Sequence, residues 1–188
     1  MRQLLILRHA KTERSNAGGD HARRLIERGR ADAARMGDYL LEQGLKPAMA
    51  LVSDATRARE TFEALARAFN APVRTSFDRA LYLAAPDTLI DALREAPDDC
   101  QTLLLVGHNP GLHELAYNFS DSGESADVDA LATKFPTCAL AVITFETTHW
   151  RDIASAPARL ERFVTARSLR PEDNTGGAPV AGSGTHAD

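Results

Sequence analysis

The chain has 188 residues, of which 44% are hydrophobic and 26% are charged, and its net charge is −4. This composition predicts a single soluble domain. It excludes collagen-like and wholly disordered classes, and the aliphatic runs are too short for the ~20 apolar residues that span a bilayer. Because the chain is slightly acidic overall, we expect neither nucleic acid nor a membrane surface as a partner.

The amino-terminal segment predicts a cytoplasmic protein. It becomes polar at Arg8, so it lacks the apolar stretch of roughly 7 to 15 residues that a secretory signal contains. Cys100 and Cys138 lie far apart and show no metal-ligand spacing. We therefore expect neither a disulfide nor a metal site, and no cofactor.

The first half of the chain alternates predicted strands with predicted helices. The strands are short apolar runs, and the helices place apolar residues three and four positions apart on one face. Gly44 stands where a glycine commonly ends a helix. In chain order we predict a strand at 3–7, a helix at 25–43, a strand at 49–53, a helix at 56–70 and a short strand around Val73.

The second half continues the alternation with one interruption. Residues 120–136 are rich in Asp, Ser and Gly and are predicted to be a long irregular insertion. Residues 171–188 lack aromatic side chains, so we predict a disordered tail after a domain at 1–170. The remaining predictions are a helix from Pro86, a strand at 102–106, a helix at 112–119, a strand at 139–145 and edge strands at 150–153 and 160–164.

This spacing predicts a three-layer α/β/α sandwich with a mostly parallel central sheet, because parallel strands need crossover helices between them. Ligands of such sheets bind beyond the carboxyl ends of the strands. Arg8 and His9 follow the first predicted strand, Arg57 lies soon after the second, and His108 follows the strand at 102–106. We expect these four side chains to form one anion-binding pocket.

A phosphoryl group suits two arginines and two histidines. Each guanidinium group can form two parallel hydrogen bonds to its oxygens, and imidazole supplies either a further hydrogen-bond donor or a nucleophile. Catalysis of phosphoryl transfer depends mainly on positioning and charge stabilisation, which such a pocket provides.

Three motifs extend this interpretation, at residues 7–11 (LRHAK), 53–61 (SDATRARET) and 106–111 (VGHNPG). They resemble the histidine phosphatase (phosphoglycerate mutase-like) superfamily, and most closely its SixA-type phosphohistidine phosphatase branch. The resemblance covers roughly residues 3–170. It implies that His9 is the nucleophile and that Arg8, Arg57 and His108 hold the phosphoryl oxygens. Ala10 replaces the glycine that usually follows Arg-His in this family, and we expect the turn to stay intact.

The general acid of the family has no clear counterpart in this chain. Many members carry Glu or Asp after the third sheet segment, whereas residues 81–83 contain no carboxylate. Asp78 and Asp87 are the nearest candidates, although Asp87 also suits the first turn of a helix without any catalytic role. A phosphohistidine leaves as imidazole, whose conjugate acid has a pKa of ~6.5, so it needs less proton help than an alkoxide.

We therefore predict a cofactor-free phosphatase, expected to be a monomer, that removes a phosphoryl group from phosphohistidine on a signalling or phosphotransfer protein through a phospho-His9 intermediate. One alternative is a phosphatase of small phosphate monoesters or anhydrides that uses Asp87 or Asp78 as its acid. Another is a non-catalytic phosphate- or phosphoprotein-binding module.

Several cations near the predicted pocket have two interpretations. Lys11 either adds charge near the phosphate or is a solvated loop lysine. Arg23, Arg24 and Arg28 either line a docking face for a phosphorylated protein or, as we prefer, are solvated side chains at a helix start.

Overall fold

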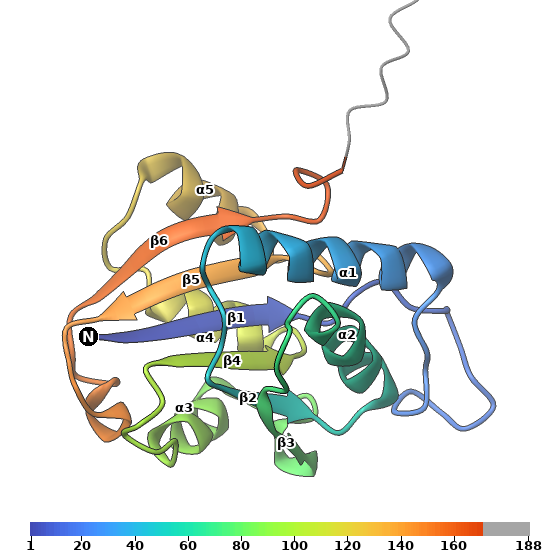
Figure 1. Ribbon diagram of the computed structural model, residues 1–188, viewed down its shortest axis with the longest axis horizontal. Coiled ribbons are helices and arrows are strands. Elements are labelled where there is room, and N and C mark those ends of the chain that lie inside the picture. The colour runs from blue at the N-terminus through green and yellow to red at the C-terminus, as the bar shows by residue number, and fades with distance from the viewer. Residues whose placement is uncertain (171–188) are drawn as a thin grey trace, which may run out of the picture.

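Six strands form a single sheet in the structure, a computed structural model that describes residues 1–170 (Figure 1). The strands are β1 (Arg2–Arg8), β2 (Met49–Ser53), β3 (Arg74–Asp78), β4 (Thr102–Gly107), β5 (Leu140–Phe145) and β6 (Ala158–Val164). Their order is β3-β2-β4-β1-β5-β6. β1 to β4 are parallel, whereas β5 is antiparallel to both β1 and β6. The tail predicted at 171–188 lies outside the described residues.

Helices cover both faces of this sheet. They are α1 (Glu27–Glu42), α2 (Thr56–Ala66), α3 (Pro86–Arg94), α4 (Gly111–Asn118) and α5 (Ser125–Thr133), with short 3₁₀ turns η1 (Arg79–Leu81) and η2 (Trp150–Asp152). In Figure 1, α1 and α2 lie on the near face of the sheet. Within residues 1–170, no helix is long and apolar enough to cross a membrane.

Alternating side chains of β1 build two hydrophobic cores. Leu4 and Ile6 pack with residues of α3, α4 and α5, while Leu5 and Leu7 pack with residues of α1 and α2. All four are fully buried, and each burial is worth about 1.5–3 kcal/mol. A strand buried on both faces requires such a continuous apolar run. The fold is the predicted three-layer α/β/α sandwich with a mostly parallel sheet.

Most predicted elements are present close to their expected bounds. The strands predicted at 49–53 and 102–106 match β2 and β4 to within one residue, and α1 occupies most of the predicted helix at 25–43. The helix predicted at 56–70 is shorter, because α2 ends at Ala66.

The prediction of an irregular insertion at 120–136 is wrong at its centre, which is helix α5. Three alanines favour the helix intrinsically. Leu131 is its fully buried anchor, and the Asp127 carboxylate accepts a hydrogen bond from the Phe163 N–H of β6 at 3.0 Å. Because Leu131 is the one buried side chain of this helix, its sequence shows almost no amphipathic pattern from which a helix could be predicted.

The edge strand predicted at 150–153 is also wrong, since this segment begins with the 3₁₀ turn η2. Trp150 is fully buried, and its indole N–H donates to the Cys100 carbonyl at 2.7 Å. The aromatic ring thus packs into the core from a turn. In the sequence, the apolar residues of this turn resemble the apolar residues of a short strand.

The register of the sheet brings the carboxyl ends of three strands together. Arg8 of β1 lies beside Gly107 of β4, and Val52 of β2 lies beside Val106. The segments that follow β1, β2 and β4 therefore emerge at one edge of the sheet, on the right in Figure 1.

Candidate functional site

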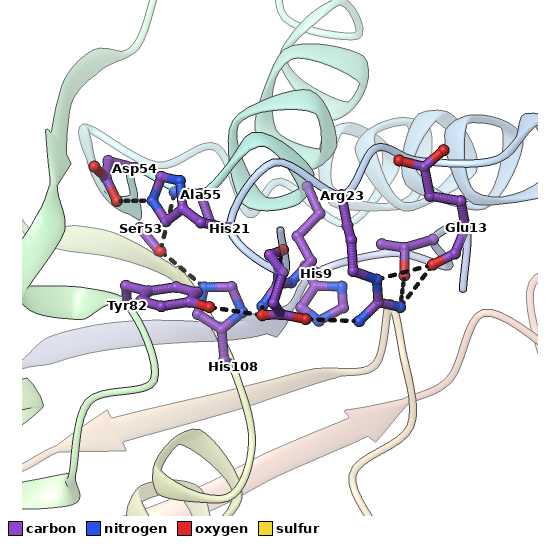
Figure 2. A network of polar contacts seen from close by, with 12 residues as sticks. His9, Glu13, His21, Arg23, Ser53, Asp54, Ala55, Tyr82 and His108 are labelled. Atoms are coloured by element: carbon purple, nitrogen blue, oxygen red, sulfur yellow. Dashed lines mark hydrogen bonds and ion pairs between the residues drawn. The ribbon is translucent and has the colours of Figure 1, made fainter. Parts of the chain in front are cut away.

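A cavity of about 600 Å³ opens at this edge, and all four predicted site residues line it. Its lining includes Arg8, His9, Asp20, Arg57, His108 and Asn109. We call it the phosphate pocket. Figure 2 shows the rings of His9 and His108 next to each other, with centroids 5.2 Å apart.

The backbone around His9 is tied to both β4 and α2. The His9 N–H donates to the Gly107 carbonyl at 3.1 Å. The Ala10 N–H donates to the Thr61 hydroxyl oxygen at 2.9 Å, and that hydroxyl donates to the Arg57 carbonyl at 2.6 Å. Ala10 is fully buried and adopts a negative φ, so alanine fits without backbone strain and the turn is intact.

His9 has the protonation state that a nucleophile needs. Burial, reinforced by the charges of Arg57 and Arg8, lowers its pKa to about 3, so the ring is neutral near pH 7. Nδ1 lies 2.8 Å from the Ala10 carbonyl oxygen, which can only accept, so Nδ1 carries the proton. The lone pair is therefore on Nε2.

His108 is held by Ser53 at the end of β2. The two side chains are buried, with Nε2 and the Ser53 Oγ 2.8 Å apart. Ser53 Oγ already accepts from the Ala55 N–H, and its own proton needs an acceptor, which Nε2 provides. Burial and the proximity of His9 lower the pKa of His108 to about 3. The remaining N–H, on Nδ1, has no hydrogen-bond partner among the described residues.

Arg8 and Arg57 concentrate positive charge in the phosphate pocket. Burial and the nearby Arg57 lower the pKa of Arg8, while its Nη1 donates to the Phe135 carbonyl at 2.9 Å. Arg57 lies in the first turn of α2 and is 3% exposed. A half-buried guanidinium group and the buried one that lowers its pKa favour an anion beside them.

Asp20 is a pocket residue that sequence reasoning missed. Its backbone carbonyl accepts from Arg57 Nη1 at 2.6 Å, and its carboxylate accepts from Arg57 Nη2 at 2.9 Å. The carboxylate also accepts from the Tyr82 hydroxyl at 2.6 Å and from Arg23 at 2.9 Å. Figure 2 shows Tyr82 and Arg23 flanking the two histidines.

These contacts fix the charge of Asp20. The hydrogen bonds from Tyr82 and then Arg23 hold its pKa well below the usual range, so it is ionised at neutral pH. No local motif marks this residue, because it lies in the irregular segment between β1 and α1. Its importance depends on Tyr82, sixty-two residues later.

The two carboxylates proposed as general acids lie outside the phosphate pocket. Asp78 is exposed, and its Oδ1 accepts a hydrogen bond from the Ala80 N–H at 2.8 Å, which caps η1. Asp87 is exposed in the first turn of α3, beside Pro86. Neither residue belongs to the lining of the pocket.

Comparisons with known proteins show what this chain is similar to. The family model of the histidine phosphatase superfamily (branch 1) matches residues 4–78. An uncharacterized protein of Mycobacterium tuberculosis is 36% identical over 163 residues, which cover 86% of this chain and 100% of that protein.

Solved structures show the same fold. The putative phosphohistidine phosphatase SixA from Nakamurella multipartitia aligns with a TM-score of 0.74 and 27% identity, covering 87% of this chain and 95% of that chain. The putative phosphohistidine phosphatase SixA from Agrobacterium tumefaciens aligns with a TM-score of 0.73 and 29% identity, covering 87% of this chain and 97% of that chain.

Proposed function

This chain belongs to the histidine phosphatase superfamily, and on that premise we propose that it hydrolyses phosphohistidine on a signalling or phosphotransfer protein. The observation that carries the proposal is the neutral His9, whose Nε2 lone pair stands in a pocket with two arginines. The likeness to SixA-type structures supports the substrate class.

The first step transfers the phosphoryl group to His9. Nε2 forms a bond to phosphorus while the bond from phosphorus to the substrate's imidazole nitrogen breaks, and the electron pair leaves with that nitrogen. The substrate ring carries a proton on its other nitrogen, so it leaves as neutral imidazole and its departing nitrogen needs no proton in this step. Covalent catalysis of this kind divides one difficult displacement into two easier ones.

Arg8, Arg57 and His108 stabilise the transferred group. The guanidinium groups neutralise the charge on its oxygens, and Nδ1–H of His108 is a hydrogen-bond donor that has no partner within residues 1–170. Because these donors are fixed by Phe135, Asp20 and Ser53, little reorganisation is needed when the phosphoryl group binds.

The absence of a protonated acid in the pocket lining supports phosphohistidine over alkyl phosphates. Asp20 is the one carboxylate among the described lining residues, and it is ionised at neutral pH. An imidazole leaving group, with a conjugate-acid pKa of ~6.5, departs without much proton transfer, whereas an alkoxide does not.

The second step regenerates the enzyme. Water attacks the phosphorus of phospho-His9, its proton passes to solvent, and the electron pair of the breaking bond returns to Nε2. Inorganic phosphate is released, and the net reaction is hydrolysis of the substrate's phosphorus–nitrogen bond.

The test compares initial rates on a phosphohistidine peptide, p-nitrophenyl phosphate and a sugar phosphate. We expect kcat/KM to fall in that order, with the alkyl phosphate slowest by ~10²-fold or more. Equal kcat/KM for the sugar phosphate and the peptide would contradict the proposal and favour a small-molecule monoesterase.

Trapping the intermediate identifies the nucleophile. We expect an acid-labile, base-stable phosphoenzyme, located on His9 by mass spectrometry and lost in His9→Ala. His149→Ala is the matched control, because His149 is a partly exposed histidine that pairs with Asp98 outside the pocket. Full activity of His9→Ala would remove His9 from the mechanism.

A further inference from the structure

A second cavity, of about 240 Å³, lies next to the phosphate pocket and shares Lys11 and Thr137 with it. Its lining carries five basic side chains, from Lys11, Arg28, Lys134, Arg167 and Arg170. We call it the cationic cavity. The shared residues mean that one extended ligand can occupy both cavities.

The charge of the cationic cavity is unbalanced. Among residues 1–170, the one acidic residue that lines it is Asp32, which is bound by Arg170 and Arg35. Lys11, Arg28, Lys134 and Arg167 are exposed, and none forms an ion pair within the described part of the chain. The whole chain has a net charge of −4, so this local excess of cations does not follow from a basic composition.

The backbone beneath these cations is fixed. The Lys11 carbonyl accepts from the Ile26 N–H at 3.1 Å. A Cβ on Gly29 would lie 2.1 Å from the same carbonyl oxygen, so only glycine allows α1 to approach Lys11 this closely. This contact holds Lys11 beside Arg28 at the start of α1.

The other side of the cavity is fixed as well. Asp32 is 4% exposed and accepts from Arg170 Nε at 3.1 Å and Nη2 at 2.7 Å, which holds the segment after β6 against α1. Lys134 precedes Phe135, whose carbonyl accepts from Arg8 in the phosphate pocket. The cavity is therefore built from segments whose backbones are held together.

We propose that the cationic cavity binds the carboxylates of an acidic segment on the phosphoprotein substrate while its phosphoryl group occupies the phosphate pocket. This inference rests on the proposed function. Exposed cations from four separate segments match several carboxylates spaced along a polypeptide, whereas one compact anion contacts only two or three of them.

The physical consequence is selectivity in binding rather than in chemistry. Exposed charges attract the partner and fix its orientation, so they act on KM and on the association rate. At about 0.5 M salt the Debye length falls well below 8 Å, so the preference is expected to weaken there.

The experiment uses two phosphohistidine peptides of equal length, one with Asp and Glu around the phosphohistidine and the other with Asn and Gln. At about 0.05 M salt, we expect the wild-type protein to prefer the acidic peptide by about fivefold to tenfold in kcat/KM, through KM. In Arg28→Gln/Arg167→Gln this preference falls close to one, while p-nitrophenyl phosphate hydrolysis is unchanged, since neither residue lines the phosphate pocket.

Arg67→Gln/Arg151→Gln is the matched control, because it removes two exposed arginines that do not line either cavity. This control keeps the wild-type preference. Equal kcat/KM for the two peptides in the wild-type protein would overturn the inference. So would an equal loss of preference in the control variant, which would indicate a general charge effect.

The proposed function and this inference fail in different ways. If the protein hydrolyses p-nitrophenyl phosphate but neither peptide, only the substrate class is wrong. The cavity is then tested by inhibition with the unphosphorylated peptides, and stronger inhibition by the acidic one still supports carboxylate binding. A sugar bisphosphate is the competing ligand. If it inhibits the wild-type protein more strongly than the acidic peptide does, and if this difference in inhibition disappears in Arg28→Gln/Arg167→Gln, the cationic cavity binds a small anion and the proposed binding of an acidic segment is wrong.

Discussion

At the scale of single residues, the burial of ionisable side chains in the phosphate pocket lowers the stability of the folded protein. His9 and His108 are buried as neutral rings, and burial together with the charge of Arg57 lowers the pKa of Arg8. Each arrangement costs free energy in the folded protein, and a phosphoryl dianion in the pocket offsets that cost. The site is thus complementary to its charged ligand before that ligand arrives.

The first prediction concerns stability and pH. The folded-state pKa values of His9 and His108 are about 3, below the unfolded value of ~6.5, so the unfolded state binds more protons between these limits. The free energy of unfolding is therefore expected to fall as the pH drops from about 6.5 to about 4.5, by roughly 1 kcal/mol per pH unit for each histidine.

Urea unfolding at several pH values measures this slope. His9→Asn, which cannot be protonated, is expected to make this slope smaller. A slope that does not change in His9→Asn would mean that the ring is protonated in the folded protein.

The second prediction concerns Asp20, whose carboxylate contacts Arg57. Asp20→Asn removes a negative charge beside the site where phosphate binds. We expect inorganic phosphate to inhibit this variant more strongly, with a gain of roughly 1 kcal/mol, or about fivefold in the inhibition constant. Asp87→Asn is the control, because this carboxylate lies outside the pocket, and it leaves the constant unchanged. Weaker inhibition in Asp20→Asn would show that Asp20 chiefly orients Arg57.

At the scale of elements, close contacts between helices position the residues of the phosphate pocket. Arg57 lies in the first turn of α2, and α2 packs on α1 through Gly37, where an added Cβ would lie 2.3 Å from the Leu65 carbonyl oxygen. The glycine therefore permits an approach of the two backbones that no other residue allows. The position of Arg57 relative to His9 depends on this packing.

The third prediction follows from that contact. Gly37→Ala raises helix propensity but forces α1 and α2 apart, so we expect a net loss of about 1–3 kcal/mol in the free energy of unfolding. Asp38→Ala introduces the same residue at the next, exposed position of α1 and is expected to cause no loss. Chemical denaturation of both variants makes the comparison, and equal stabilities would contradict the close-packing argument.

At the scale of the whole molecule, one sheet carries both the stability and the site. The buried hydrophobic residues of the two cores lie between Leu4 and Ala166, on either face of the sheet. The parallel strands bring segments that are up to a hundred residues apart to one edge, where the phosphate pocket opens. A domain boundary at residue 170 stays a proposal.

The fourth prediction is that removing residues 171–188 leaves the melting temperature and the activity unchanged. The deleted segment contains no aromatic residue, and the Asp32–Arg170 ion pair that anchors the preceding segment is retained. Thermal unfolding and p-nitrophenyl phosphate hydrolysis test it. A second truncation that also removes Arg170 is expected to lower the melting temperature, because it leaves the buried Asp32 with one partner fewer.

The sequence alone determined the features that neighbouring residues control. Apolar runs such as Leu4–Leu7 marked buried strands, and their alternation with helices indicated the layered fold. The convergence of His9, Arg57 and His108 in one pocket followed, because parallel strands end at the same edge. The motifs around these residues resembled the superfamily to which the chain belongs.

Only the tertiary structure decided the features that depend on distant contacts. Helix α5 is stabilised by contacts of Leu131 and Asp127 with residues far along the chain. Trp150 packs into the core from a 3₁₀ turn, and its indole N–H donates a hydrogen bond to the Cys100 carbonyl. Asp20 lies in the pocket because the irregular segment after β1 folds over it, whereas Asp78 at the end of β3 and Asp87 at the start of α3 lie outside the pocket lining. Such positions are fixed by hydrogen bonds between segments, and these leave no periodicity in the sequence.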